Sequence, residues 1–153
     1  MFNYLDLVIL AGGKGSRLKE ITRNTPKPLI KINGIPFIQY LLNQYSKYYF
    51  RNIYILAGYK GYKIKKQFHK KTANLIPIHC SIEKKMKGTG GALFILKNKI
   101  KSNFILINGD SFFDYNISLL NNFKLNSNLG SMILIKNKIY KENQKLSKLG
   151  IDR

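Results

Sequence analysis

The chain has 153 residues, a formal net charge of +20, 44% hydrophobic residues and a single cysteine, Cys80. This length and hydrophobic content fit one globular domain with a sizeable core, and no apolar run is long enough to span a membrane. One cysteine excludes an intrachain disulfide and a cysteine metal cluster. The opening MFNYLDLVIL lacks the basic region and cleavage site of a signal peptide. We therefore expect a cytoplasmic protein without a membrane partner.

The high positive charge raises the hypothesis of nucleic-acid binding. The lysines, however, are spread along the chain apart from YKGYKIKKQFHKK at 59–71, and the chain is rich in Asn, Ile, Lys and Tyr. This pattern is typical of a compositional bias across a whole protein, and the same field would attract a phosphate-rich small substrate. We therefore expect no nucleic-acid partner and keep a basic nucleic-acid-binding module as the less favoured alternative.

Short apolar runs alternate with helical patterns along the chain. Strands are predicted at 4–10, 52–58, 76–83, 103–109 and 130–136, and helices at 36–50, 60–71, 89–100 and 117–126. The alternating segment 28–32 ends at Asn33-Gly34, which is a turn signal. This order predicts an α/β fold, a three-layer Rossmann-like and mostly parallel sheet flanked by helices.

The first predicted strand runs into a glycine-rich, basic loop, LVILAGGKGSRL at 7–18. Glycines allow the main chain to approach phosphate oxygens, and consecutive N–H groups form an anion-binding concavity at the carboxyl end of a strand. Lys14 and Arg17 add positive charge. The loop fits neither the Walker pattern nor the dinucleotide fingerprint, which requires glycine where Leu18 stands. A tight turn with chance basic residues is the alternative.

Two further residues stand in special settings. Lys27 lies between two prolines, which hold it in a stiff extended segment where it could reach a phosphate; a solvated lysine is the alternative. Asp110 ends an apolar strand, where a buried carboxylate is costly unless it is paired or bound to a cation; capping of the next turn is the alternative. We expect Asp114 to cap the helix that starts near 117, and a metal role is the alternative.

The remaining candidates for chemistry are few. His69 is expected on the basic helix and His79 on a strand, and neither has ligand or triad spacing. We interpret both histidines as structural and Cys80 as buried.

Four motifs together resemble a known family. LAGGKGSRL followed by PKPLIKINGIPFI is similar to the paired loop and P-K-P segment of the sugar-1-phosphate nucleotidylyltransferases. IEKKMKGTGGAL (82–93) and LINGDSFFD (106–114) resemble two further segments of that family, in the same order. The resemblance covers roughly residues 4–135. The last two segments most resemble the D-glycero-D-manno-heptose 1-phosphate guanylyltransferase branch, with mannose-1-phosphate guanylyltransferases and glucose-1-phosphate thymidylyl- or cytidylyltransferases as neighbours.

The resemblance implies a nucleotide-diphospho-sugar transferase type of fold and a set of site residues. Three are implied to be catalytic: Arg17, Lys27 and Asp110, and Asp110 is also implied to bind Mg²⁺. The nucleotide is implied to contact Ala11, Gly12, Gly13, Gly15, Ser16, Glu83, Gly88, Thr89 and Gly90. Glu83 would read the base edge and so favour GTP, and a solvated strand end is the alternative. Met86-Lys87-Gly88 departs from the family's Pro-Leu-Gly.

The implied reaction transfers a nucleoside monophosphate from an NTP, with GTP favoured, to a heptose or hexose 1-phosphate for surface polysaccharide precursors. We expect residues 1–153 to form a single nucleotidyltransferase domain. We expect its nucleotide-binding half to be largely complete and its sugar-binding C-terminal part to be truncated or absent, because the resemblance implies a later Glu-Lys segment and a second aspartate that this sequence does not reach. A nucleotide-binding remnant without catalysis is the alternative, and a homo-oligomer is left open.

Overall fold

The computed structural model describes residues 2–85, 88–122 and 130. The chain divides into two compact units, Met1–Ser118 and Leu119–Arg153. The second unit is described only over residues 119–122 and at Gly130, so the fold presented below is that of the first unit.

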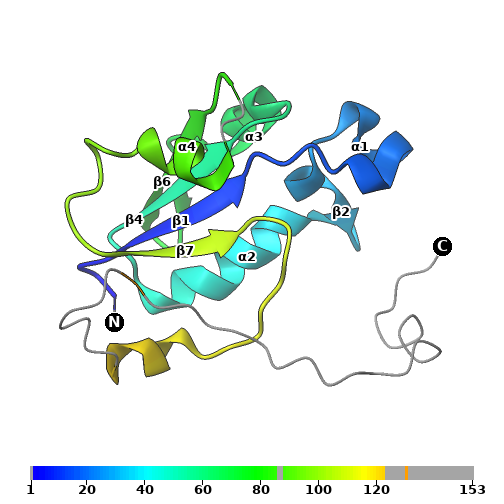
Figure 1. Cartoon of the computed structure of the whole chain (residues 1–153). Helices are drawn as coiled ribbons and strands as arrows, with labels where there is room; N and C mark the ends of the chain where they lie inside the picture. Colours follow the sequence, from blue (N-terminus) through cyan, green and yellow to red (C-terminus); the bar gives the residue numbers. More distant parts are fainter. Residues whose placement is uncertain (1, 86–87, 123–129, 131–153) are drawn as a thin grey trace, which may run out of the picture. The chain divides into compact units, whose positions relative to one another are not determined.

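A twisted five-stranded sheet forms the centre of the first unit (Figure 1). Four strands run parallel, and their order across the sheet is β6-β4-β1-β7, with the short strand β5 antiparallel beside β6. The strands are β1 (Asp6–Ala11), β4 (Asn52–Ala57), β5 (Thr72–Ala73), β6 (Ile76–Ile82) and β7 (Phe104–Asn108).

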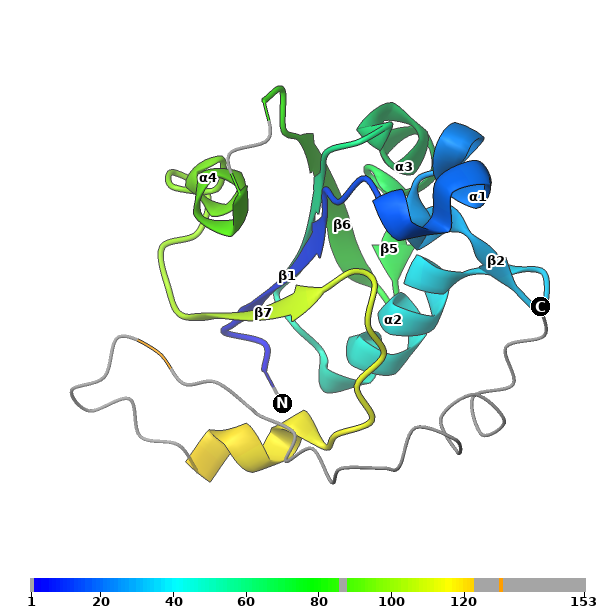
Figure 2. The same cartoon turned by 45° about the vertical axis from the view of Figure 1, so that its right-hand side comes forward.

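Helices cover both faces of this sheet and complete three layers. Figure 2 shows α4 on one face and α2 and α3 on the other. The helices are α1 (Lys19–Asn24), α2 (Phe37–Tyr45), α3 (Gly61–Phe68) and α4 (Gly88–Phe94), and 3₁₀ turns occupy Ser16–Leu18, Lys27–Leu29, Ser46–Tyr48 and Ile117–Asn122. A separate hairpin joins β2 (Lys31–Ile32) to β3 (Ile35–Pro36).

Strand β1 is almost completely buried because both of its faces are covered. Val8 packs beneath α4 in one apolar cluster with residues of the neighbouring strand and of the segment from α4 onward, namely Tyr54, Leu56, Ala92 and Leu96. Leu7 and Ile9 alternate with Val8 and so face the layer of α2 and α3, where they are fully buried. The run LVIL therefore belongs to two hydrophobic layers at once.

The order of the strands reverses at β1. The chain steps from β1 to β4 to β6 in one direction, and then returns across the sheet to place β7 on the other side of β1. In open parallel sheets a crevice forms at such a reversal, outside the carboxyl ends of the strands, and ligands bind there. The loop after β1 and the residues after β7 meet at this point.

The opposite end of β1 carries a buried charge of a different kind. Asp6 is fully buried, and the Arg51 guanidinium donates to both of its carboxylate oxygens, with Nη2 at 2.6 Å from Oδ2 and Nε at 3.1 Å from Oδ1. Asn52 Nδ2 donates to the same Oδ1 at 2.9 Å. This carboxylate is satisfied within the fold and ties the starts of β1 and β4 together.

Four of the five predicted strands are present, at β1, β4, β6 and β7. The strand predicted at 130–136 lies outside the described residues except for Gly130, which has no regular structure. The Asn33-Gly34 turn is confirmed, because both residues have positive φ and join β2 to β3.

Three of the four predicted helices are present but shorter, as α2, α3 and α4. Regular helix ends at Tyr45, Phe68 and Phe94, and the last predicted helix is a 3₁₀ turn over Ile117–Asn122 with 123–126 outside the described residues. His69 was expected on the basic helix but lies just beyond α3, because its backbone is extended. The cap expected from Asp114 is wrong, because Asn116 directly precedes the turn and its Oδ1 accepts the Ser118 N–H at 3.1 Å.

Cys80 is buried as expected, and burial raises the pKa of its thiol to about 11. His69 Nδ1 accepts the Cys80 backbone N–H at 3.1 Å, so this ring connects the end of α3 to β6. His79 stacks on Tyr54, and its Nε2 lies 3.3 Å from Asn52 Oδ1. Within the described ranges, no helix is long and apolar enough to cross a bilayer.

Candidate functional site

Backbone groups pack directly on one another where β1, β4 and β7 end. A Cβ at Gly58 would lie 2.6 Å from the carbonyl oxygen of Gly12, and a Cβ at Gly109 would lie 2.7 Å from that of Leu10. The Tyr59 N–H donates to Gly12 at 3.1 Å and the Gly109 N–H donates to Leu10 at 2.8 Å. Glycine is therefore required at 58 and 109, and it brings the three strand ends close together.

The loop after β1 turns at Gly15, which has a φ of +64° that favours glycine. Its carbonyl accepts two hydrogen bonds, from the Leu18 N–H at 2.9 Å and from the Thr22 hydroxyl at 3.2 Å. A Cβ at Gly15 would meet Thr22 at 2.9 Å and the side chain of Lys27 at 3.4 Å. The turn therefore packs against both α1 and the stem of Lys27.

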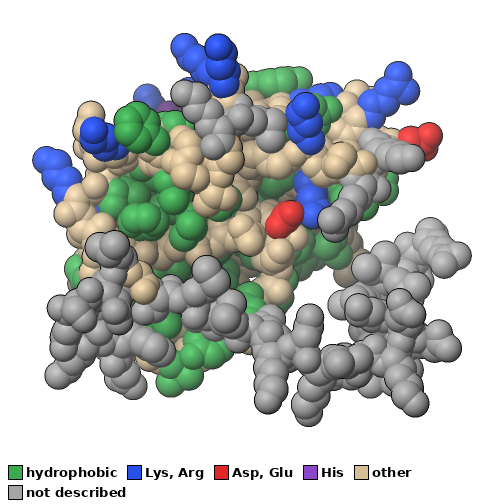
Figure 3. All heavy atoms as spheres, viewed as in Figure 1, with side chains coloured by type: hydrophobic (Ala, Val, Ile, Leu, Met, Phe, Trp, Pro, Cys, Tyr) green, Lys and Arg blue, Asp and Glu red, His purple; other side chains and the backbone are tan. Residues whose placement is uncertain are grey.

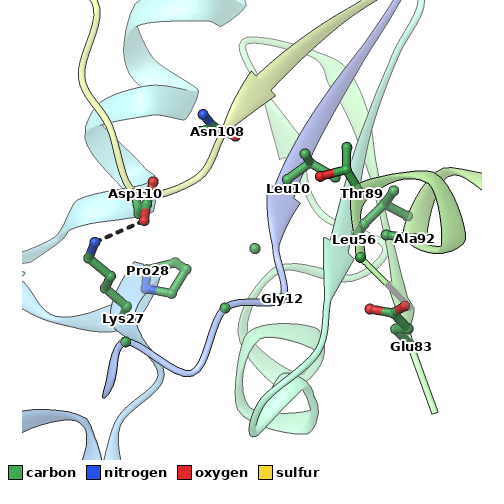
Figure 4. Close-up of a pocket in the computed structure, with 14 residues that line it drawn as sticks. Leu10, Gly12, Lys27, Pro28, Leu56, Glu83, Thr89, Ala92, Asn108 and Asp110 are labelled. Atoms are coloured by element: carbon green, nitrogen blue, oxygen red, sulfur yellow. Dashed lines mark hydrogen bonds and ion pairs between the residues drawn. The ribbon is translucent and has the colours of Figure 1, made fainter. Parts of the chain in front are cut away.

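Lys27 and Asp110 form an ion pair between two loops that are 83 residues apart in the sequence (Figure 4). Lys27 Nζ lies 2.8 Å from Asp110 Oδ2, and the two side chains are 35% and 45% exposed. The Ser111 hydroxyl donates to the other carboxylate oxygen at 3.1 Å. The hydrogen bond from Lys27 is the main cause that holds the pKa of Asp110 below its usual value.

A cavity of about 310 Å³ opens at the same edge of the sheet. Figure 4 shows Lys27, Pro28 and Asp110 on one side of Gly12, and Glu83, Thr89 and Ala92 on the other. The cavity is lined by Leu10, Ala11, Gly12, Gly13, Gly15, Lys27, Pro28, Leu56, Glu83, Gly88, Thr89, Ala92, Asn108 and Asp110. One cavity thus has a charged end and a more apolar end, with the glycine loop between them.

The apolar end lies between the sheet and α4. Leu56 and Ala92 belong to the cluster beneath α4, and Leu10 packs against that cluster. Glu83 follows β6 directly, and its N–H donates to the Ala57 carbonyl at 2.7 Å. Glu83 Oε2 lies 3.7 Å from the position that a Cβ on Gly12 would occupy. A carboxylate therefore stands at the edge of an apolar wall.

Among the residues that the structure describes, basic side chains do not gather into one patch on the face shown in Figure 3. Figure 3 shows Lys and Arg side chains scattered over the face, with acidic groups beside some of them.

The model of the family described as nucleotidyl transferase matches residues 7–146, which is most of the chain. The chain belongs to this nucleotidyl transferase family. The loop at 12–15, Lys27, Glu83 and Asp110 all fall inside the matched range.

Two groups of curated relatives and one solved structure are informative. The chain is 36% identical over 116 residues to the D-glycero-alpha-D-manno-heptose 1-phosphate guanylyltransferase of Campylobacter jejuni, covering 76% of this chain and 52% of the relative. It is 35% identical over 120 residues to the bifunctional protein GlmU of Methanococcus maripaludis, covering 78% and 28%. It is also similar to the crystal structure of HddC from Yersinia pseudotuberculosis complexed with GMP-PN, with a TM-score of 0.61, 36% identity, and 69% and 48% coverage.

The nucleotidyl transferase fold also extends to more distant structures. A glucose-1-phosphate thymidylyltransferase described as putative, from Bacillus anthracis, superposes with a TM-score of 0.69 at 24% identity, which is a likeness of fold. The chain spans about half the length of the heptose guanylyltransferase it matches.

The cavity brings together most of the residues that the family motifs had predicted. Those that line it are Ala11, Gly12, Gly13, Gly15, Lys27, Glu83, Gly88, Thr89 and Asp110. Ser16 instead lines a second hollow with Lys14 and Tyr59. Gly90 is exposed on α4 and does not line the cavity. The side chain of Arg17 lies outside the described part of the chain.

Sequence reasoning missed five residues of the cavity wall: Leu10, Pro28, Leu56, Ala92 and Asn108. Asn108 could have been found, because it is the last residue of a strand that leads into Gly109-Asp110. No local sequence signal marks Leu56 and Ala92 as cavity residues, because an apolar residue in a strand or helix can equally belong to the core. Their place in the wall depends on how α4 packs across the ends of β1 and β4.

Asp110 is the residue at the charged end that could contribute to a metal site. Among the described residues, no three His, Cys, Asp or Glu side chains gather where they could hold a metal ion. Magnesium is commonly bound through one or two carboxylates together with substrate phosphates. A single exposed carboxylate beside a lysine fits that arrangement, in which a bound phosphate supplies further oxygen ligands.

Proposed function

We propose that this chain binds a nucleoside triphosphate in the cavity and transfers its nucleoside monophosphate to a sugar 1-phosphate, with release of pyrophosphate. GTP is the favoured nucleotide, and a heptose or hexose 1-phosphate is the favoured acceptor. The observation that carries the proposal is the division of one cavity into a charged end at Lys27 and Asp110 and an apolar end edged by Glu83. The sequence similarity to the heptose guanylyltransferases supports the same assignment.

The phosphates belong at the charged end. Gly12, Gly13 and Gly15 line the cavity without side chains that would keep phosphate oxygens away from the backbone N–H groups. Lys27 brings an ammonium group to the same end and so places positive charge where a triphosphate is most negative. Arg17, two residues after Gly15 in the sequence, is the second cation that we assign to the phosphates.

The base belongs at the apolar end, between the loop and α4. Leu56, Ala92 and Leu10 offer an apolar surface to a planar ring. The Glu83 carboxylate can accept two hydrogen bonds from N1–H and N2–H₂ of guanine, a pair of donors that thymine and cytosine do not present together. Glu83 is thus the residue that we assign to guanine selection.

The reaction needs charge neutralisation more than proton transfer. A phosphate oxygen of the sugar phosphate attacks the α-phosphorus in line, and this oxygen is already ionised at neutral pH. Lys27 and Arg17 bring two anionic partners together and stabilise the charge on the reacting phosphates. Magnesium, which Asp110 would hold together with substrate phosphates, would supply further neutralisation when bound.

Isothermal titration of the chain with GTP, ATP, UTP and CTP, followed by a pyrophosphate-release assay with heptose and mannose 1-phosphate, tests the proposal. We expect tightest binding of GTP and pyrophosphate release that depends on the sugar phosphate. Glu83→Gln should reduce the preference for GTP, whereas Glu20→Gln, a matched change in the second hollow, should leave it unaltered. Equal binding of all four nucleotides would contradict the base assignment.

Binding of GTP without pyrophosphate release would identify a nucleotide-binding chain without catalysis. DNA or RNA binding that rises steeply as salt falls, and that GTP does not displace, would instead favour a nucleic-acid module. Failure of GTP to bind would remove the proposal altogether.

A further inference from the structure

Three side chains from the β4–α3 turn and the first turn of α3 hydrogen-bond the end of α1, the helix that follows the glycine loop. Tyr59 Oη donates to the Arg23 carbonyl at 3.3 Å, and Lys60 Nζ donates to the same carbonyl oxygen. Lys63 Nζ donates to the next carbonyl, that of Asn24. We call Tyr59, Lys60 and Lys63 the clamp.

These contacts satisfy the end of α1. Arg23 and Asn24 are its last two residues, and the final carbonyls of a helix have no partner within the helix. Two ammonium groups at this end also interact favourably with the helix dipole. Because α1 has only six residues, bonds of this kind weigh heavily in fixing where the helix lies.

The clamp reaches the proposed phosphate end by two short routes. Toward the N-terminus, Thr22 on α1 hydrogen-bonds the carbonyl of Gly15, where the loop turns. Toward the C-terminus, α1 leads through Thr25 and Pro26, both extended, to Lys27. Tyr59 also holds the start of the loop, because its backbone N–H donates to Gly12.

Lys60 adopts a backbone conformation that a lysine disfavours. Its φ is 49°, in the left-handed region where glycine is the usual residue. Its ammonium also lies 5.5 Å from the centre of the Tyr59 ring. A lysine at this position therefore adds contacts that glycine would lack, although glycine would fit the backbone better.

We infer that the clamp residues are positioning residues for nucleotide binding, which act by fixing the loop at 12–18 and Lys27 through α1. The inference rests on the proposed function, because it names the residues that hold the proposed phosphate-binding groups in place. None of the three clamp residues lines the cavity.

The test uses the full chain with Lys60→Gly and Lys63→Met, and with Lys66→Met as the matched control. Lys66 is an exposed lysine of α3, the helix that also carries Lys63. Its substitution by methionine removes one positive charge, as each clamp substitution does. Dissociation constants for magnesium GTP are measured by titration calorimetry, and hydrogen exchange of residues 13–24 is measured in the free chain. Melting temperatures report on overall stability.

We expect both clamp variants to weaken GTP binding about threefold to tenfold, in line with the loss of one charge-assisted hydrogen bond each. Exchange at 13–24 should accelerate, while Lys66→Met changes neither quantity by more than about twofold. Lys60→Gly should keep or raise the melting temperature, because glycine relieves the left-handed backbone. Weaker binding with undiminished stability separates positioning from a general structural role.

Two results would overturn the inference in distinguishable ways. Clamp variants that bind GTP and exchange hydrogen as Lys66→Met does would overturn it alone and leave the proposed function standing. A parent chain that binds no GTP would overturn the proposed function and the inference with it.

Discussion

Lys27 Nζ and Asp110 Oδ2 lie 2.8 Å apart, so in the free chain the two side chains form an ion pair with each other. Lys27 begins the 3₁₀ turn that follows α1, whereas Asp110 follows β7, and the two side chains meet at the carboxyl edge of the sheet. In the proposed function both have other partners, a phosphate for the lysine and a magnesium ion for the carboxylate. Ligand binding must therefore exchange this ion pair for new contacts.

The first prediction concerns nucleotide binding without metal. Asp110→Asn should strengthen the binding of GTP in the presence of EDTA by about twofold to fivefold, which corresponds to the weak attraction of an exposed ion pair. The substitution releases Lys27 and removes a negative charge next to the phosphates. Titration calorimetry measures the effect, and Asp114→Asn, an exposed residue away from the cavity wall, makes the same charge change as a control. Weaker or unchanged binding by Asp110→Asn would contradict the exchange.

The second prediction concerns turnover. Lys27→Met should lower kcat about a hundredfold, as for other removed groups that stabilise transition-state charge, and leave the ratio of kcat/KM for GTP over UTP unchanged. Steady-state pyrophosphate release measures both quantities, with Lys31→Met on β2 as the control. The pKa of Asp110 should also rise toward its usual value, since Lys27 is the main cause of its depression. A variant that keeps its kcat but loses base selectivity would exclude a role for Lys27 at the phosphates.

The third prediction concerns the close packing of the strand ends. Gly109→Ala places a Cβ 2.7 Å from the Leu10 carbonyl oxygen, so the free energy of unfolding should fall by about 1–3 kcal/mol. Gly90→Ala is the control, because a Cβ there meets no atom within 4 Å, and alanine in a helix is favoured over glycine by roughly 0.5–1 kcal/mol. Urea denaturation compares the two variants. Equal stability of both would mean that β1 and β7 do not approach as described.

The fourth prediction concerns acid. The His69 ring is neutral when Nδ1 accepts the Cys80 N–H, and burial, followed by the charge of Lys65, holds its pKa below its usual 6.5. A pKa that is lower in the folded state than in the unfolded state gives a stabilising contribution that is present above about pH 6.5 and is lost as the pH falls through the folded value. Urea midpoints should therefore decrease from pH 7.5 to pH 5.

His69→Asn provides the comparison for that effect, because the amide oxygen of asparagine can replace the acceptor and does not titrate in this range. The decrease of the midpoint between pH 7.5 and pH 5 should become smaller in this variant. An equal decrease in the variant would assign the acid sensitivity to another group.

The layered sheet could be predicted from the sequence because its strands carry their own signals. The runs LVILA and IYILA are apolar, short and followed by glycine, and they appear as β1 and β4. Helix α1 was missed because the segment from Lys19 to Asn24 has neither an apolar face nor a capping residue. Its position is set by contacts with Gly15 and with the distant clamp, which no local pattern contains.

The candidate site likewise combines features that local sequence predicts with features that only distant contacts determine. Lys27 and Asp110 were singled out separately, by flanking prolines and by a polar end to an apolar strand, but their ion pair depends on the packing of loops 83 residues apart. Ser16 was expected in the same group as Gly15, yet it lines a different hollow, because the chain turns away into a 3₁₀ turn at this residue. Motif spacing thus identified most of the wall, while the direction of individual side chains required the fold.

The most direct test of the central claim is a crystal structure of the chain with a non-hydrolysable GTP analogue and magnesium. We predict the triphosphate against the backbone of residues 12–15, with Lys27 on a phosphate, Asp110 next to the metal and the guanine edge at Glu83. A nucleotide bound elsewhere on the chain, with the Lys27–Asp110 ion pair intact and the cavity free of ligand, would contradict the account.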